Sequence, residues 1–282
     1  MSKVAVVGAG TMGNGIAHVF AQHGWDTVLI DVSKDALARG VAAIEKNTDR
    51  QVKKAALSAD QRRALLAHIK TSTELDAAKD AELIVEAATE NPDVKFQIFE
   101  DLDHLTGDGT IIASNTSSIS ITEIAKQATQ PRRVIGMHFM NPVPVMKLVE
   151  VIRGKETSNE TVKKIVAIVT ALGKTPVEVN DAPGFVSNRV LMPMINEAIF
   201  CVQDGIATAE GVDEVMKLGM NQPIGPLALA DLIGLDVCLA IMQVLQQGLD
   251  RDKYRPAPLL EEMVAAGKLG RKSGQGFYAY RD

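Results

Sequence analysis

Short apolar runs alternate with amphipathic helical stretches through the first half of the chain. The runs are mostly apolar on both faces, as strands covered by helices are, and they span Val4–Val7, Thr27–Ile30, Leu83–Glu86, Thr110–Ala113 and Val134–Gly136. Helical periodicity covers the stretches between them, at Gly13–His23, Asp35–Lys54, Asp93–His104 and Thr122–Gln127. This alternation predicts an α/β fold built on a Rossmann-like, doubly wound sheet.

The segment after the second run is longer than one crossover helix requires. Lys34–Ile69 is rich in charged residues, and Leu57-Ser58-Ala59-Asp60 within it has the composition of a turn and a new helix start. Either Ser58 or Asp60 can serve as the N-cap. We therefore expect a helical hairpin over about residues 35–70, projecting from the domain with one polar side.

The pattern changes near residue 181. Asn180-Asp181-Ala182-Pro183-Gly184 is a turn cluster, and helical periodicity then continues to about Gly267 without a convincing strand. The sequence thus predicts an α/β domain over residues 1–182 and a smaller all-α C-terminal domain over residues 183–282.

Composition and charge narrow the class of protein. The 282 residues carry a formal net charge of -5, with 46% hydrophobic and 23% charged residues, a balance typical of globular proteins. No basic stripe is present, so we expect no nucleic-acid partner. The most apolar stretch, Leu227–Leu245, is interrupted by Asp231, Gly234 and Asp236, so we expect no membrane span.

Cysteine usage and the N-terminus indicate a compartment. Cys201 and Cys238 are too few for a secreted disulfide framework, although a disulfide between them stays the less favoured alternative. The chain enters its first strand without a charged leader, which favours a cytoplasmic location. We expect no metal site.

The first strand leads directly into Gly8-Ala9-Gly10-Thr11-Met12-Gly13, which has the GxGxxG spacing. In this position the first glycine permits a tight turn, the second admits a pyrophosphate and the third packs helix against strand. The phosphates would lie at a helix N-terminus, where free N–H groups favour negative charge. A glycine-rich loop without a ligand is the alternative, but the strand and helix on either side favour a dinucleotide.

Asp31 closes the second strand, where an acid can bind the adenosine ribose. Its carboxylate would repel the 2′-phosphate of NADP, and no arginine follows in Val32 or Ser33 to receive that phosphate. We therefore expect NAD as the cofactor, with Lys34 as the one nearby cation that argues the other way.

A second informative segment runs from Arg133 to Ile152, where two apolar runs flank a loop containing Pro142 and Pro144. If the runs pair antiparallel about Pro144, His138 lies opposite Glu150, within reach of a hydrogen bond. Histidine is a natural base for removing a hydroxyl proton, and a buried carboxylate fixes its tautomer and stabilises the imidazolium. A core histidine beside an unrelated glutamate is the alternative interpretation.

Ser114-Asn115-Thr116-Ser117-Ser118 follows another strand of the same half. Polar residues at the carboxyl end of a parallel strand are where α/β folds place ligand contacts. One of these serines can instead cap the helix that follows, and both roles can hold for different residues.

Taken together, the motifs resemble those of the short-chain L-3-hydroxyacyl-CoA dehydrogenases, in the same order over essentially the whole chain. The motifs are GAGTMG at 8–13 with Asp31, ATEN at 88–91, SNTSS at 114–118, HFMNPVPVMKLVE at 138–150, PGFVSNR at 183–189 and GRKSGQGFYAY at 270–280. The resemblance implies reversible, NAD-dependent oxidation of an (S)-3-hydroxyacyl-CoA to the 3-ketoacyl-CoA, with 3-hydroxybutyryl-CoA and acetoacetyl-CoA as the expected pair.

The resemblance also implies residue roles. His138 looks like the catalytic base and Glu150 like its partner, while Ser117 and Asn188 resemble residues that hold the substrate's 3-oxygen. Asn141 resembles an asparagine of the same pocket, close to both substrate and cofactor. The expected cofactor contacts form a larger set: Gly8, Gly10, Thr11, Met12, Gly13, Asp31, Glu90, Lys95, Asn115, Ser117 and Asn141.

The helical hairpin resembles an element that covers coenzyme A, and Lys54 matches a lysine there that meets its phosphates. On composition alone, a solvated helix face is the better interpretation of Lys54. The family's helical second domain forms a dimer interface, which implies a homodimer through residues 183–282. The glycines of the C-terminal motif resemble a structural ending.

Two rival functions remain open. A β-hydroxyacid dehydrogenase would need a catalytic lysine in the first interdomain helix, but none occurs between Lys174 and Lys217, and Asn188 stands in the corresponding region. A non-catalytic descendant of the enzyme is the second rival. It is disfavoured because the polar residues of the expected pocket are all present.

Overall fold

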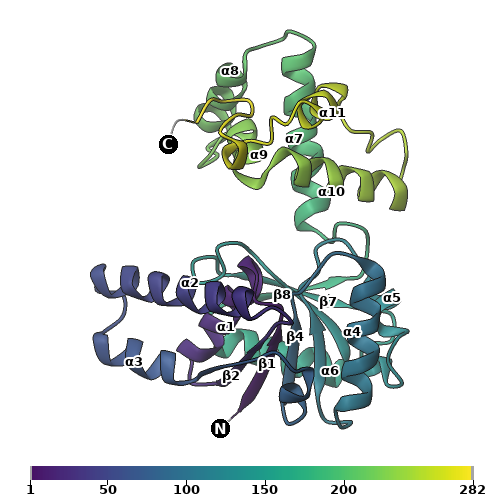
Figure 1. Ribbon diagram of the computed structural model, residues 1–282. Coiled ribbons are helices and arrows are strands. Elements are labelled where there is room, and N and C mark those ends of the chain that lie inside the picture. Colours follow the sequence, from purple (N-terminus) through teal and green to yellow (C-terminus); the bar gives the residue numbers. More distant parts are fainter. Residues whose placement is uncertain (1, 281–282) are drawn as a thin grey trace. The chain divides into compact units, whose positions relative to one another are not determined.

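The computed structural model describes residues 2–280 and divides into two compact units, Met1–Ala182 and Pro183–Asp282. The first unit is an eight-stranded sheet with helices on its faces, and the second is helical (Figure 1). The predicted doubly wound α/β fold with a helical C-terminal part is confirmed.

The sheet has the strand order β3-β2-β1-β4-β5-β6-β7-β8. Every neighbouring pair is parallel except β6 and β7. The strands are β1 (Lys3–Val7), β2 (Asp26–Ile30), β3 (Ile69–Ser72), β4 (Leu83–Glu86), β5 (Ile111–Ser114), β6 (Val134–Phe139), β7 (Leu148–Arg153) and β8 (Thr175–Asn180). The strand order reverses between β1 and β4, so ligands of a doubly wound sheet are expected at the carboxyl ends of these two strands.

The central strands are buried on both faces because helices cover the sheet. The apolar side chains of β1, β4, β5 and β6 are nearly all inaccessible to solvent and pack against those of the covering helices. The helices of this unit are α1 (Thr11–Gln22), α2 (Lys34–Lys53), α3 (Ala59–Ala67), α4 (Pro92–Leu105), α5 (Ile121–Ala125) and α6 (Asn159–Ala171), with short 3₁₀ turns at Leu75–Ala78 and Pro131–Arg133.

α2 and α3 form the predicted helical hairpin and extend beyond the sheet (Figure 1). Of the two candidate N-caps, Ser58 is the cap: its hydroxyl accepts from the Gln61 N–H while the Gln61 side chain accepts from the Ser58 N–H. The hairpin ends at Ala67, because the next residues form the edge strand β3. The polar sequence of that strand, Ile-Lys-Thr-Ser, gave no apolar run to predict it from.

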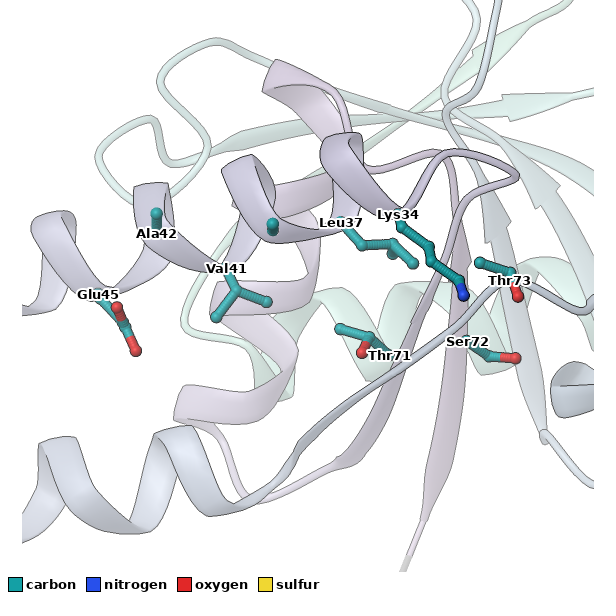
Figure 2. A pocket seen from close by; sticks show the side chains of 9 residues that line it. Lys34, Leu37, Val41, Ala42, Glu45, Thr71, Ser72 and Thr73 are labelled. Atoms are coloured by element: carbon teal, nitrogen blue, oxygen red, sulfur yellow. The ribbon is translucent and has the colours of Figure 1, made fainter.

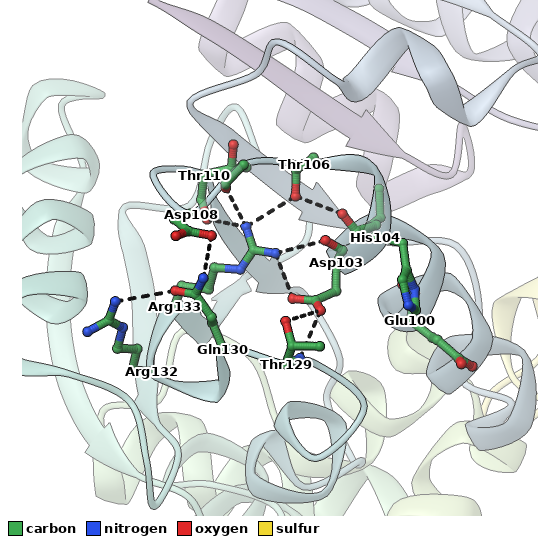
Figure 3. Close-up of polar contacts among 12 residues, drawn as sticks. Glu100, Asp103, His104, Thr106, Asp108, Thr110, Thr129, Gln130, Arg132 and Arg133 are labelled. Atoms are coloured by element: carbon green, nitrogen blue, oxygen red, sulfur yellow. Dashed lines mark hydrogen bonds and ion pairs between the residues drawn. The ribbon is translucent and has the colours of Figure 1, made fainter.

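A buried ion pair joins the end of α4 to the start of β6 (Figure 3). The Arg133 guanidinium donates to the Asp103 carboxylate at 2.6 Å and to four other oxygen acceptors, the Thr106 hydroxyl and the carbonyls of Asp103, Gly107 and Thr110. The hydroxyl and backbone N–H of Thr129 donate to the other Asp103 oxygen. These bonds anchor the strand on which His138 lies.

Up to residue 280, the second unit packs five α-helices around its own apolar core. They are α7 (Ser187–Gln203), α8 (Ala209–Glu214), α9 (Pro226–Ile233), α10 (Leu235–Gly248) and α11 (Pro258–Ala265), with a π turn at Val215–Gly219 and a 3₁₀ turn at Arg271–Ser273. Cys201 and Cys238 are both free thiols, and burial raises the pKa of Cys238 to about 12.

Two buried aspartates hold the C-terminal segment against these helices. Asp231 accepts from the backbone N–H groups of Phe277 and Tyr278, and Asp213 accepts from the Tyr278 hydroxyl. A Cβ at Gly276 would lie 1.9 Å from the Asp231 carboxylate, so this glycine is required by the packing. Burial and the bond to Asp213 raise the pKa of Tyr278.

In the part of the chain that the structure describes, no single helix is long and apolar enough to cross a membrane. α9 and α10 pass that test only as a pair, and a 98° bend separates them.

Candidate active site

The glycine turn follows β1 and begins α1 at the carboxyl edge of the sheet. Gly8 has a φ of 101°, and a Cβ there would lie 2.5 Å from the backbone of Ala88. A Cβ at Gly13 would lie 1.7 Å from the Gly8 carbonyl oxygen. The fold itself therefore requires glycine at both positions.

Gly10 differs from these two glycines because no contact within residues 2–280 requires a glycine there. Its φ is -65°, and a Cβ there would meet no atom within 4 Å. Gly10 is the N-cap of α1, where no side chain caps the N–H groups of the first turn, which includes Thr11 and Met12. Open space before uncapped helix N–H groups is what a pyrophosphate needs, so these residues fit a dinucleotide.

The Asp31 carboxylate lies beside this turn. One of its oxygens accepts from the Ala9 N–H at 2.8 Å and the other from the Ser33 N–H at 2.9 Å. A carboxylate oxygen can accept more than one hydrogen bond, so these contacts leave acceptor capacity for ribose hydroxyls. Asp31 thus has a structural role in the turn that the sequence did not indicate.

His138 and Glu150 are directly opposed across the antiparallel β6–β7 pair, as the sequence predicts. The His138 Nδ1 and a Glu150 carboxylate oxygen are 2.8 Å apart. Both side chains are buried, with His138 8% and Glu150 2% exposed. A carboxylate at this distance holds Nδ1 protonated in the neutral ring and stabilises the doubly protonated ring.

The polar run after β5 is organised by Glu90. Its carboxylate accepts from the hydroxyl of Thr116 and from both the N–H and the hydroxyl of Ser117. Asn115 is buried, and its side-chain oxygen accepts from the Phe139 N–H, next to His138. The Glu90 bonds fix the polar run after β5, and the Asn115 bond joins that run to the β6–β7 hairpin.

Lys95 is buried and paired inside the sheet domain and is not exposed at its surface. Its side chain is 1% exposed, and its ammonium pairs with the Glu86 carboxylate at 2.5 Å. The Ser114 hydroxyl and the Ala88 N–H donate to the same carboxylate. Glu86, which the sequence did not single out, therefore holds the ends of β4 and β5 together. The contact of Lys95 with the nicotinamide side stays a prediction.

The other predicted residues are spread over the two units. Asn141 is exposed at the start of the loop after β6, and Lys54 is exposed at the C-cap of α2. Asn188 belongs to the second unit, where it is buried in the first turn of α7. Their roles toward substrate stay predictions.

A pocket of about 660 Å³ opens between α2 and the end of β3 (Figure 2). Apolar side chains of α2, among them Leu37 and Val41, form one wall, and Thr71, Ser72 and Thr73 form the other. The ammonium of Lys34 lies at the end nearer these hydroxyls (Figure 2). None of the predicted catalytic residues lines this pocket.

Within residues 2–280, no group of acidic, His and Cys side chains is arranged to hold a metal ion.

A dinucleotide-binding turn together with a buried imidazole–carboxylate pair defines a nicotinamide-dependent dehydrogenase. The model of the 3-hydroxyacyl-CoA dehydrogenase NAD binding domain matches residues 3–182, and that of the family's C-terminal domain matches residues 184–280. The chain belongs to the 3-hydroxyacyl-CoA dehydrogenase family.

Several similar relatives are bacterial. A probable 3-hydroxybutyryl-CoA dehydrogenase of Bacillus subtilis is 53% identical over 100% of this chain and 98% of its own length. A counterpart in Deinococcus radiodurans is 54% identical over 99% of this chain and 100% of its own. The crystal structure of (S)-3-hydroxybutyryl-CoA dehydrogenase from Ralstonia eutropha superposes with a TM-score of 0.97, at 52% identity and with 100% of both chains covered.

Proposed function

We propose that this protein catalyses the reversible, NAD-dependent oxidation of (S)-3-hydroxyacyl-CoA to 3-ketoacyl-CoA, with 3-hydroxybutyryl-CoA as its principal substrate. The observation that carries this proposal is the buried pairing of His138 with Glu150 in a chain whose first 182 residues contain an NAD-binding domain. The names of the bacterial relatives support the four-carbon substrate.

His138 is the general base of the proposed oxidation. With Nδ1 bonded to Glu150, the proton of the substrate hydroxyl passes to Nε2. The imidazolium so formed is stabilised by the Glu150 carboxylate, and in the reverse reaction it returns the proton to the ketone oxygen. Ser117 is held by Glu90 after β5, the strand that pairs with β6, and its hydroxyl would bind the same substrate oxygen.

NAD fits the glycine turn and, when bound, supplies the acceptor for the hydride that leaves C3. Gly10, Thr11 and Met12 would hold its pyrophosphate through the uncapped N–H groups of α1. Asp31 would accept its ribose hydroxyls, and Val32, whose side chain is 93% exposed, offers an apolar surface to the adenine. Glu90, Lys95, Asn115 and Asn141 are the proposed contacts on the nicotinamide side.

The acyl-CoA is the proposed partner of the remaining site residues. Asn188 would position the acyl group, and Lys54 at the exposed end of α2 would meet the CoA phosphates. The charge at the end of α2 supports this assignment. The last turn of α2 carries Arg50 and Lys53 beside Lys54, and these three cations would attract the negatively charged phosphates.

Initial rates with pure enantiomers test the proposed function. We expect turnover of (S)-3-hydroxybutyryl-CoA with NAD and none above background with the (R) enantiomer, because a base held in one buried geometry serves one face of the carbon. Rates with C8 and C16 substrates show which acyl chain length the enzyme prefers, and rates with NADP show how strongly it prefers NAD. Equal rates with both enantiomers, or no turnover of any 3-hydroxyacyl-CoA, would contradict the proposal, and the second result would favour a non-catalytic relative.

We also propose a homodimer formed through the second unit. Large apolar side chains are exposed there, on or beside α8 and the following π turn, and they include Ile206, Val215, Leu218 and Met220. Clustered apolar surface of this kind marks protein interfaces. Leu218 is 84% exposed, so Leu218→Asp should leave the fold intact and convert the dimer to a monomer. Sedimentation velocity measures the result, and a wild-type protein that is monomeric at micromolar concentration would contradict the proposal.

The two free thiols support a cytoplasmic location, which cell fractionation followed by activity measurement checks.

A further inference from the structure

Lys174 lies immediately before β8 and has no role in the reaction proposed above. Its side chain is 9% exposed, and no ion pair within the described part of the chain includes it. Its ammonium donates to the carbonyl oxygens of Val143 and Met146, each at 2.6 Å. A buried ammonium held only by backbone carbonyls is costly, and burial lowers the pKa of Lys174.

The two carbonyls belong to the loop over residues 140–147 that connects β6 and β7. This loop begins two residues after His138, ends three residues before Glu150 and contains Asn141. Its internal bonds run from the N–H groups of Val145 and Met146 to the Pro142 carbonyl. They leave the carbonyls of Val143 and Met146 to the lysine.

The same loop rests on the helix that begins at the glycine turn. Val143 is 1% exposed, and a Cβ at Gly15 of α1 would lie 2.9 Å from the Val143 Cβ. Gly15 therefore gives the loop a close contact with α1, and Lys174 holds the loop by its carbonyl groups. The loop is fixed both to α1 and to the residue that precedes β8.

We propose that Lys174 is a positioning residue, whose ammonium fixes the 140–147 loop and thereby the mutual geometry of His138, Glu150 and Asn141. The inference rests on the proposed function, because it assigns the catalytic pair to this hairpin. A hydrophobic side chain of similar length would fill the same space but would leave the buried Val143 carbonyl and the partly buried Met146 carbonyl without this donor. Displacements of about 1 Å in a catalytic group can lower rates by up to about 10²-fold.

Lys174→Met is the direct test, since it keeps the length of the side chain and removes the donor. We expect kcat for acetoacetyl-CoA reduction to fall about tenfold, while the Kd for NADH, measured by calorimetric titration, changes less than threefold because the glycine turn is untouched. Lys163→Met is the matched control, because Lys163 is an exposed lysine of α6. A second control, Ile165→Ala, removes a buried side chain of α6 and destabilises the fold without touching the loop carbonyls.

Both controls should keep kcat within threefold of wild type. A fall of more than threefold in Lys174→Met alone supports the positioning role. A smaller fall, or an equal fall in Ile165→Ala, overturns it. If Lys174→Met does not fold, Lys174→Leu, which also lacks a donor, is judged by the same limits. His138→Ala, measured in parallel, separates the two proposals: full activity in that variant defeats the proposed function, whereas its inactivity beside a normal Lys174→Met defeats the positioning role alone.

Discussion

Replacing His138 by alanine should lower kcat by about 10²–10⁴-fold, the usual contribution of a general acid–base group. The imidazole is the proton acceptor in oxidation and the donor in reduction, so both directions should lose rate together. Binding of NADH should be nearly unchanged, because the glycine turn and Asp31 lie on β1, α1 and β2 rather than on this hairpin. Steady-state kinetics and calorimetric titration of NADH measure the two quantities.

His104→Ala is the matched control, because His104 is an exposed histidine in the last turn of α4. Its kcat should stay within twofold of wild type. Retention of full activity by His138→Ala would show that His138 is a core histidine with a structural partner. A variant that fails to fold is replaced by His138→Gln, which keeps most of the volume of the ring.

Replacing Glu150 by glutamine should lower kcat by about 10–10²-fold. A hydrogen bond to a charged group contributes about 1.5–3 kcal/mol, which corresponds to about 10–10²-fold, and the neutral amide of the variant loses this stabilisation of the imidazolium. The amide can also present its NH₂ group to Nδ1, which favours the ring tautomer that cannot accept the substrate proton at Nε2. Steady-state kinetics in both directions measures the loss.

Thermal unfolding separates this effect from damage to the fold. Glu150 is 2% exposed and lies within the sheet, so the near-isosteric substitution should lower Tm by only a few degrees. Glu178→Gln on β8 is the control, because Glu178 is an exposed carboxylate paired with Arg153 in the same sheet. If Glu150→Gln instead unfolds the protein and loses activity only in proportion to the unfolded fraction, the pair is structural.

The parts of the fold that the sequence predicted are those with strong periodic patterns. The buried strands β1, β2, β4, β5 and β6 are apolar runs, and the His138–Glu150 register follows from the position of the proline-containing loop. The edge strands β3 and β8 gave no such signal, because one is polar and the other is largely exposed. Strands of this kind are defined by pairing with their neighbours.

The candidate site was predictable where residue type and spacing determine the chemistry. The glycine turn and the opposed His138 and Glu150 are of this kind. The contacts of Asp31 with Ala9, of Glu86 with Lys95 and of Lys174 with the 140–147 loop join segments far apart in the sequence. No local pattern encodes such contacts, because they depend on the packing of the whole unit.

The pH dependence of kcat in the two directions tests the role of His138 most directly. Oxidation requires the neutral ring and reduction the protonated ring, so across the pH range in which the protein stays folded we expect kcat for (S)-3-hydroxybutyryl-CoA oxidation to rise with pH. Over the same range, kcat for acetoacetyl-CoA reduction should fall, and His138→Ala should lose both dependences. If the residual activity of His138→Ala keeps the wild-type pH profiles in both directions, a group other than His138 carries the proton.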